Sequence, residues 1–253
     1  MPGMSDIRYF ERSDGGRTAF RHAAGQGPAL VFLPGYMSDM DGGKASALFD
    51  WAAQQERECL LLDYSGCGSS DGDFADGTLS KWRDEIVELV EAQVSGPVVL
   101  VGSSMGGWLM LLVAAKLGHR LAGLVGIAAA PDFSDWGYDA SQKRQLEGGE
   151  TVFEDNPYGP DPTPTYAGFW RDAQTHRLLA SGIDLTCPVR LLHGQRDADV
   201  PWNVSMQLAQ GLRSDAVQVH LVKDGDHRLS RPQDIRLLLT VVANLLDSLD
   251  PPL

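Results

Sequence analysis

Short apolar runs alternate with longer stretches of helical character along most of the chain, and this alternation limits the possible folds more than any other feature. Six runs rich in Val, Ile, Leu and aromatic residues are predicted as strands, at residues 29–33, 59–63, 98–101, 121–127, 189–193 and 217–222. Predicted helices lie between or after them, at residues 43–55, 79–93, 105–117, 204–212 and 233–249. Such alternation is typical of a mostly parallel sheet whose crossover helices cover both faces. We therefore predict an α/β fold with a doubly wound sheet.

Two segments depart from this alternation. Residues 7–12 and 18–22 flank the turn sequence Ser-Asp-Gly-Gly, which predicts an antiparallel pair of strands at the amino-terminal edge of the sheet. Residues 131–186 show no clear strand and are rich in proline and aromatic residues. A structureless loop of that length is unusual in a compact domain, and its aromatic density is too high for a disordered linker. We expect a single domain over residues 1–253, with residues 131–186 forming a small helical cap inserted within it.

Charge and cysteine content argue against several classes of partner. The net charge of −13 disfavours nucleic acid and an anionic membrane surface, since both require a concentrated basic face. The three cysteines include no Cys-x-x-Cys pair, so neither a disulfide framework nor a zinc knuckle is indicated. The apolar segment 108–115 is too short to span a bilayer. Residues 1–10 contain no apolar stretch of signal length, so we expect a cytoplasmic protein; the sequence leaves the oligomeric state open.

Two windows match the pentad Gly-x-Ser-x-Gly, and at most one of them can be the turn that presents a catalytic serine. In such a turn a strand runs in and a helix runs out, so that the serine oxygen is raised above the sheet. The window at 102–106 has a β-branched apolar run before it and a helix-favouring stretch after it. The window at 68–72 lies among alternating glycine, serine and aspartate, which is typical of a loop. Ser104 is therefore the predicted nucleophile, and Ser70 is predicted to be a loop serine.

A serine nucleophile needs a histidine base, and the histidine needs a carboxylate that holds its tautomer. His227 follows the last predicted strand, so it is expected at the same sheet edge as Ser104. The other histidines fit structural positions: His22, His119, His176, His193 and His220. In proteins with this chain order the acid follows the preceding strand, where the sequence offers Asp197 and Asp199. We predict Asp197 as the acid, because Asp199 is close to Pro201 and better placed to cap the next helix.

The oxyanion of an acyl-transfer intermediate needs two backbone N–H donors. One comes from the residue after the nucleophile, Met105, and the other from the loop after an earlier strand, where Gly35 allows a tight turn before Tyr36. We therefore predict the amides of Met105 and Tyr36 as the oxyanion hole. Trp108 and Trp202, close in sequence to the nucleophile and the acid, are predicted to contact the substrate. This chemistry requires no metal ion and no organic cofactor.

Several motifs occur in one order along nearly the whole chain. They are the Pro-Gly turn at 34–35, the glycine-rich loop at 63–72, the nucleophile turn at 102–106, the acid turn at 194–201 and the histidine turn at 226–228. With these motifs the chain resembles the α/β-hydrolase fold family in its serine-nucleophile branch, and within it the mitochondrial palmitoyl-protein thioesterases. The resemblance implies an α/β-hydrolase fold with a Ser104 acyl-enzyme. It also implies hydrolysis of acyl thioesters or carboxylic esters on small-molecule or protein-linked substrates.

Two other functions stay open on the sequence. A serine peptidase that releases amino-terminal residues needs an acidic subsite for the substrate ammonium, which Asp132 or Asp135 would provide. A binding protein can keep the fold without catalysis, although the set of Ser104, Asp197 and His227 argues against it. A preference for amide over ester substrates would favour the peptidase. Failure of a serine-reactive phosphonate to label the chain would favour the binding protein.

Overall fold

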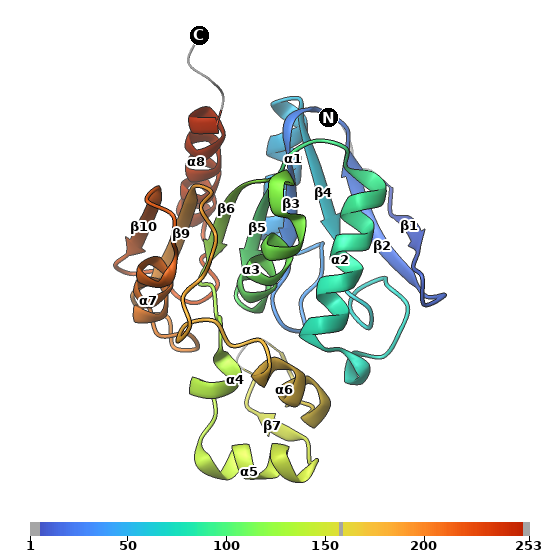
Figure 1. Cartoon of the computed structure of the whole chain (residues 1–253), viewed down its shortest axis with the longest axis vertical. Helices are drawn as coiled ribbons and strands as arrows, with labels where there is room; N and C mark the ends of the chain where they lie inside the picture. The colour runs from blue at the N-terminus through green and yellow to red at the C-terminus, as the bar shows by residue number, and fades with distance from the viewer. Residues whose placement is uncertain (1–5, 157–158, 250–253) are drawn as a thin grey trace.

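An eight-stranded sheet runs through the middle of the molecule (Figure 1). The computed structural model describes residues 6–156 and 159–249. The strands of the sheet are β1 (Arg8–Glu11), β2 (Arg17–Ala23), β3 (Gln26–Leu33), β4 (Arg57–Leu62), β5 (Val98–Ser103), β6 (Leu121–Ile127), β9 (Val189–Gly194) and β10 (Val217–Val222). Their order is β1-β2-β4-β3-β5-β6-β9-β10. Six neighbouring strands, from β4 to β10 in this order, run parallel, and all six were predicted from their apolar runs.

The apolar composition of the central strands follows from their position between two layers of helices. All six residues of β5 are buried, and so are all six of β9. The edge of the sheet formed by β1 and β2 is different. There β2 pairs antiparallel with β4, and β1 pairs antiparallel with β2. Three of the four residues of β1 are exposed, as expected for an edge strand. The predicted antiparallel pair at the amino-terminal edge is therefore confirmed.

Helices cover both faces of the sheet (Figure 1). On one face pack α1 (Gly43–Gln54) and α8 (Pro232–Leu249). On the other face pack α2 (Leu79–Gln93), α3 (Met105–Leu117) and α7 (Asn203–Gly211). In α2 the Thr78 hydroxyl caps the first turn, and Trp82, Ile86 and Leu89 repeat at helical spacing toward the core. The five predicted helices and the doubly wound arrangement are confirmed, with helix ends that agree to within one residue.

Between β6 and β9 the chain leaves the sheet and forms a separate group of elements at one end of the molecule (Figure 1). We call this segment, residues 131–186, the insertion. It contains α4 (Phe133–Trp136), α5 (Ala140–Gly148), β7 (Val152–Glu154), β8 (Thr163–Thr165) and α6 (Ala167–Gln174). The predicted short helices are present, but the absence of strands is wrong, because β7 and β8 form an antiparallel pair. With three residues each, they are too short to show the alternation that reveals a strand. That the insertion acts as a cap stays a prediction.

Polar contacts attach the insertion to the body of the protein. The Ser80 N–H and hydroxyl, at the start of α2, donate to the carboxylate of Asp172 on α6 at 2.9 and 2.6 Å. The ring Nε2 of His176 lies 2.7 Å from the same hydroxyl, and Trp108 Nε1–H donates to the His176 carbonyl oxygen at 3.1 Å. Burial lowers the pKa of His176, against the opposing charge of Asp172. These contacts hold α6 against α2 and α3.

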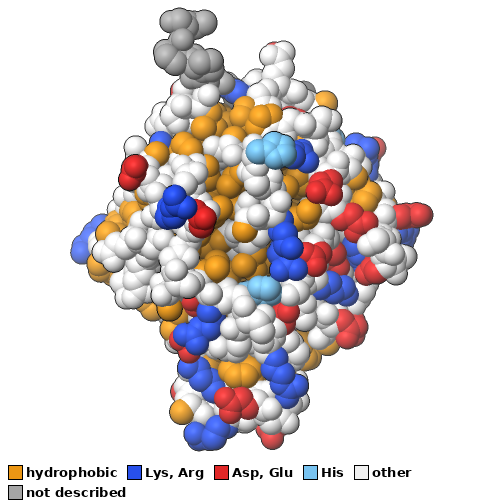
Figure 2. Space-filling view, viewed as in Figure 1, with side chains coloured by type: hydrophobic (Ala, Val, Ile, Leu, Met, Phe, Trp, Pro, Cys, Tyr) orange, Lys and Arg blue, Asp and Glu red, His pale blue; other side chains and the backbone are white. Residues whose placement is uncertain are grey.

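The loops after β3, β5, β9 and β10 meet at one edge of the sheet, since the carboxyl ends of parallel strands lie side by side. The insertion lies at this edge as well (Figure 1). Two short 3₁₀ helices, η1 (Phe74–Asp76) and η2 (Gly118–Arg120), lie in the remaining connections. On the face shown in Figure 2, acidic and basic side chains are interspersed and form no continuous basic patch. Within residues 6–156 and 159–249, no helix combines the length and apolar character that a membrane crossing needs.

Candidate active site

The turn between β5 and α3 holds Ser104 in a strained conformation. Its φ of 55° and ψ of −120° are disfavoured for a residue with a Cβ atom. A Cβ added at Gly102 would lie 2.3 Å from the carbonyl oxygen of Gly106, and one added at Gly106 would lie 2.1 Å from that of Leu33. Both glycines of the pentad are therefore needed for the turn to pack against the end of β3. The turn has the strand-to-helix context that the sequence predicts.

The second pentad forms a loop. The Ser70 hydroxyl donates to the carbonyl oxygen of Asp63 at 2.7 Å and accepts the N–H of Ala19 at 2.8 Å. The Asp63 carboxylate in turn accepts the N–H groups of Met40 and Ser69 at 2.7 and 2.8 Å. In the described part of the chain, no histidine is hydrogen-bonded to Ser70. Ser70 ties the loop to the edge of the sheet, which is the structural role predicted for it.

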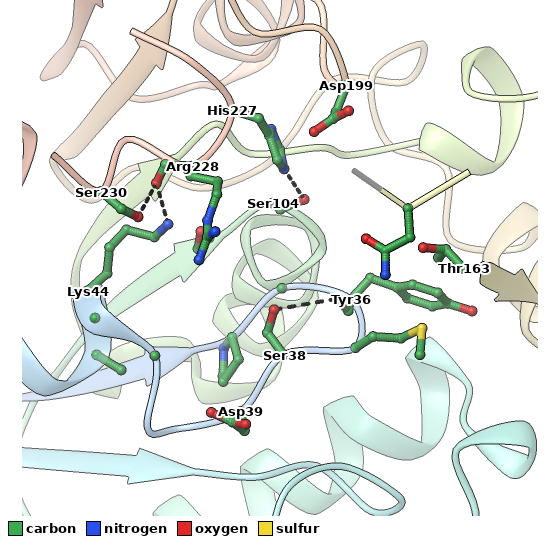
Figure 3. Close-up of a pocket in the computed structure, with 18 of the residues that line it drawn as sticks. Tyr36, Ser38, Asp39, Lys44, Ser104, Thr163, Asp199, His227, Arg228 and Ser230 are labelled. Carbon is green, nitrogen blue, oxygen red and sulfur yellow. Dashed lines mark hydrogen bonds between the residues drawn. The ribbon is translucent and has the colours of Figure 1, made fainter. Parts of the chain in front are cut away.

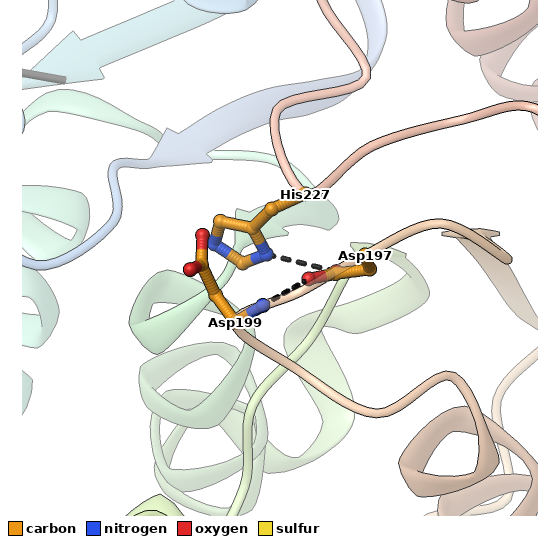
Figure 4. Close-up of side chains that lie close together, drawn as sticks. All are labelled: Asp197, Asp199 and His227. Atoms are coloured by element: carbon orange, nitrogen blue, oxygen red, sulfur yellow. Dashed lines mark hydrogen bonds and ion pairs between the residues drawn. The ribbon is translucent and has the colours of Figure 1, made fainter. Parts of the chain in front are cut away.

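Ser104, His227 and Asp197 come together at the carboxyl edge of the sheet. His227 Nε2 lies 3.1 Å from Ser104 Oγ (Figure 3), and its Nδ1 lies 2.9 Å from Asp197 Oδ2 (Figure 4). The Asp197 side chain is fully buried, whereas that of His227 is 15% exposed. A hydroxyl, an imidazole and a buried carboxylate in this sequence of contacts allow a proton to pass from the serine to the ring.

The Asp197 carboxylate accepts hydrogen bonds at both oxygens. Oδ1 accepts the N–H groups of Asp199 and Val200 at 2.9 and 2.8 Å. Oδ2 lies 2.9 Å from His227 Nδ1 and 3.1 Å from His193 Nε2. Burial alone would raise the pKa of this carboxyl, but the hydrogen bonds from His193 and His227 outweigh burial and hold the pKa well below its usual value. Asp197 is therefore ionised at neutral pH.

His193, for which the sequence predicts only a structural position at a strand end, contacts the acid directly. Its ring is fully buried, and Nε2 lies 3.0 Å from the carbonyl oxygen of Val200 as well as 3.1 Å from Asp197 Oδ2. Its Nδ1 lies 2.7 Å from the hydroxyl of Ser205 on α7. The signal that could have revealed this contact is the spacing of His193 and Asp197, four residues apart on either side of the turn at Gly194.

Asp199 does not occupy the cap position of the helix that follows it, where the sequence predicted it. The N-cap residue of α7 is Trp202, whose side chain makes no capping hydrogen bond. Instead the Asp199 carboxylate lies within 4.8 Å of side-chain ligand atoms of Asp197 and His227 (Figure 4). Such a group of three can hold a metal ion in principle, but both oxygens of Asp197 already accept hydrogen bonds. The donor set therefore fits a proton-transfer site better than a metal site.

The amides predicted for the oxyanion hole come from the loop after β3 and from the first residue of α3. A Cβ added at Gly35 would lie 3.4 Å from Ser104 Cβ, so the loop after β3 passes directly beside the nucleophile. Met105 is the first residue of α3, where backbone N–H groups have no partner within the helix. Among the described residues, neither the Tyr36 nor the Met105 N–H donates to another group. Both amides are therefore available to a bound anion.

A cavity of about 640 Å³ opens beside Ser104 and His227 (Figure 3). Loops after β3, β9 and β10, the start of α1 and the insertion line it. Its wall includes Pro34, Tyr36, Met37, Ser38, Asp39, Lys44, Glu154, Asn156, Thr163, Asp199, Arg228 and Ser230. The wall of the cavity is thus made of apolar and polar side chains together.

The two tryptophans predicted to contact substrate do not line this cavity. Trp108 is fully buried, because α3 packs with this side chain in the core, where it meets Phe133 at 5.6 Å between ring centroids. Trp202 is 40% exposed and lies outside the cavity wall. Tyr36, by contrast, lines the cavity, and its hydroxyl donates to the carbonyl oxygen of Pro164 in β8 at 2.9 Å.

The basic side chains of the cavity lie on one side of it. The Lys44 ammonium donates to the carbonyl oxygen of Arg228, and the two side chains lie next to each other (Figure 3). Burial, together with the neighbouring charge of Arg228, lowers the pKa of Lys44 to about 8. Acidic side chains of Asp39, Asp199 and Glu154 line other parts of the wall. The cavity therefore contains charges of both signs.

Proteins of known sequence and structure include close matches to this chain. A protein from Mus musculus named palmitoyl-protein thioesterase ABHD10, mitochondrial, is 39% identical over 251 residues, which cover 97% of this chain and 84% of the relative. The solved structure of alpha/beta hydrolase domain-containing protein 10 from mouse matches with a TM-score of 0.91 at 36% identity, over 97% of this chain and all of that one. A putative hydrolase from Agrobacterium vitis S4 matches with a TM-score of 0.89 at 34% identity, over 95% and 98% of the two chains.

These relatives correct the expected location. The Mus musculus protein is named as mitochondrial, so the expectation of a cytoplasmic protein is wrong. That expectation depended on cysteine spacing and the composition of residues 1–10. Neither property is specific to one compartment, since cysteine spacing reports on disulfides and metals.

The family follows from a match that spans most of the chain. A family profile described as "Alpha/beta hydrolase family" matches residues 30–236, which include the nucleophile turn, the acid turn and the histidine turn. The strand order, the helices on both faces and the matches to solved structures agree with this profile. The chain belongs to the alpha/beta hydrolase family.

Proposed function

We propose that this protein is a serine hydrolase that cleaves acyl thioesters or carboxylic esters. In the first step Ser104 Oγ attacks the acyl carbonyl carbon while His227 Nε2 takes the hydroxyl proton. The leaving thiolate or alkoxide departs with that proton, and the acyl group stays on Ser104. Water then attacks the acyl-enzyme while His227 takes a proton from it, and the acid is released as His227 returns that proton to Ser104 Oγ. Asp197 stabilises the imidazolium in both steps and keeps Nδ1–H directed at its own Oδ2.

The negative charge that develops on the carbonyl oxygen is stabilised by the amides of Tyr36 and Met105. Backbone donors fixed by a tight turn and by a helix start need no rearrangement when the charge forms. The position of Gly35 against Ser104 Cβ supports this role, because it brings the Tyr36 amide to the same side as the nucleophile.

The observation that supports the proposal best is the contact of Ser104 Oγ with His227 Nε2 at 3.1 Å, on a turn that is strained at Ser104. Strain of this kind persists only where surrounding contacts enforce it, and it is concentrated at functional sites. A structural serine needs neither the positive φ nor a histidine partner that is itself held by a buried carboxylate.

The substrate class is inferred from the relatives and from the cavity. The Mus musculus relative is named a palmitoyl-protein thioesterase, and the similarity covers 97% of this chain. Apolar groups of Pro34, Tyr36 and Met37 line the same cavity as Ser104, and an acyl group can contact them there. We therefore propose an acyl thioester, or an ester of similar shape, as the substrate.

The peptidase alternative finds little support, because the two aspartates proposed to bind the substrate ammonium interact with other groups of the protein. The Asp132 carboxylate accepts the N–H groups of Leu178 and Leu179 at 2.8 and 2.9 Å. Asp135 forms ion pairs with Lys143 and Arg177. Neither aspartate lines the cavity, so neither is placed to bind a substrate ammonium group.

A labelling experiment with a turnover assay tests the nucleophile. The Ser104→Ala variant is expected to lose labelling by a serine-reactive phosphonate and to lose about 10³-fold or more of its turnover of acyl thioesters and esters. Ser70→Ala is the matched control, since it removes a hydroxyl from the other pentad, and it should be labelled normally. Labelling that disappears in Ser70→Ala but persists in Ser104→Ala would overturn the assignment. Preference for an aminopeptidase amide substrate over the esters would overturn the reaction class.

A further inference from the structure

We propose that His193 is a positioning residue that holds Asp197 in place and so aligns the ring of His227, through the oxygen that the two imidazoles share. The inference rests on the proposed function, since it adds a residue to the same proton-transfer set. His193 does not reach the cavity and touches no substrate. Its action is transmitted through Asp197 Oδ2, which lies 3.1 Å from His193 Nε2 and 2.9 Å from His227 Nδ1.

The surroundings of His193 determine where its proton lies. Its Nε2 faces two acceptors, Asp197 Oδ2 at 3.1 Å and the carbonyl oxygen of Val200 at 3.0 Å, so Nε2 must bear the hydrogen. Its Nδ1 faces the Ser205 hydroxyl at 2.7 Å, and in a neutral ring this nitrogen accepts the hydroxyl proton. Both side chains are fully buried.

Two imidazoles meet at one oxygen of the acid, since His193 Nε2 and His227 Nδ1 both lie beside Asp197 Oδ2. The other oxygen, Oδ1, is held by the amides of Asp199 and Val200. With both oxygens held, the plane of the carboxylate is fixed, and the carboxylate in turn fixes the ring of His227. His193 therefore improves the alignment of that ring with Ser104.

Other charged groups lie near His227. Asp199 lies beside the ring on the loop after β9, Arg228 is its neighbour in the chain, and Lys44 lines the same cavity from α1. None of these three side chains makes a hydrogen bond to His193. A change at His193 therefore leaves these three charges in place, and its effect on the pH dependence of turnover can be measured separately.

The test compares two substitutions at one position by the pH dependence of kcat and kcat/KM on an acyl ester. His193→Leu removes both ring nitrogens, whereas His193→Gln keeps an N–H donor at about the reach of Nε2. In His193→Leu we expect kcat to fall about tenfold with KM within about twofold, because a hydrogen bond to a charged group is lost. The acidic limb of kcat/KM should move to higher pH by about 0.5–1 unit. His193→Gln should restore both quantities most of the way.

A control and a second variant separate positioning from stability. Val189→Ala makes a small cavity at the opposite end of β9 and should lower the thermal midpoint without moving the acidic limb. If His193→Leu does not fold, Ser205→Ala tests the same point, since loss of the hydroxyl frees the ring and should move the acidic limb in the same direction. An acidic limb that stays in place in His193→Leu or Ser205→Ala, or a Gln variant that matches the Leu variant, would overturn the inference. Retained turnover in Ser104→Ala would instead overturn the proposed function.

Discussion

At the scale of single residues, the nucleophile turn depends on positions where a side chain has no room. A Cβ at Gly106 would lie 2.1 Å from the carbonyl oxygen of Leu33 and 2.4 Å from that of Pro34. Both contacts are to backbone atoms, so no side-chain rotation can relieve them. Gly106→Ala is therefore expected to lower the free energy of unfolding by about 2–3 kcal/mol, measured by urea denaturation. It should also reduce turnover, because the displaced segment leads to the oxyanion loop.

Gly168→Ala is the control for this change. Gly168 lies in α6, and a Cβ there would have no described heavy atom within 4 Å. Because alanine is the better helix former, this variant should gain about 0.5–1 kcal/mol in the same measurement. A loss of stability at Gly168 as large as that at Gly106 would contradict the steric explanation.

Asp197 makes the fold sensitive to acid. An aspartate in the unfolded chain titrates near pH ~4, and hydrogen bonds hold the pKa of Asp197 below that value in the folded protein. The ionised carboxylate therefore favours the fold above about pH 4, and this contribution is lost as the pH falls toward the folded pKa. The free energy of unfolding should fall less steeply between about pH 4 and pH 2 in Asp197→Asn than in the parent protein. The exposed Asp215→Asn should keep the parent slope, and equal slopes in all three proteins would rule out this role.

At the scale of elements, Tyr36 connects the loop after β3 with the insertion. Its backbone amide is a proposed oxyanion donor, and its hydroxyl donates to the carbonyl oxygen of Pro164 in β8 at 2.9 Å. Its ring packs against Phe74 and Phe169, with centroids 4.9 and 5.1 Å away. One residue thus joins the site of charge stabilisation to the β7–β8 pair. A displacement of β8 would therefore be transmitted to the oxyanion loop.

Tyr36→Phe tests this connection, because it removes the hydroxyl and keeps the ring. We expect kcat for acyl esters to fall about threefold to tenfold, with KM little changed, and stability to fall by about 1 kcal/mol. Tyr166→Phe is the matched control, since the Tyr166 ring also contacts Phe74 and its hydroxyl makes no hydrogen bond among the described residues. If kcat is unchanged in Tyr36→Phe, the hydroxyl does not position the oxyanion loop.

At the scale of the whole molecule, the sheet and its helices were predictable because burial on both faces leaves a direct trace in the sequence. The runs that became β5 and β9 are continuous and apolar, and α2 and α3 end at the predicted residues. That Ser104, His227 and Asp197 lie close together was predictable for a related reason. Parallel strands bring their carboxyl ends to one edge, so order along the chain translates into proximity in space.

Other features depend on contacts that no local pattern encodes. The three-residue strands β7 and β8 exist because they pair with each other, and Trp108 faces the core because of how α3 packs. His193 contacts Asp197 only because the turn at Gly194 is tight, which is enforced by the carbonyl oxygen of Gly225, 2.3 Å from where a Cβ would lie. A sequence shows which residues are buried more readily than which buried groups face each other.

The insertion leaves and rejoins the sheet at two strands that are direct neighbours, since β6 pairs with β9 from Leu124 and Val189 onward. The pairing register of the strands therefore does not depend on the length or composition of the insertion. A change in the length of this segment leaves the strand pairing of the domain intact. The Tyr36 hydroxyl needs only a backbone carbonyl from it, which any replacement strand supplies.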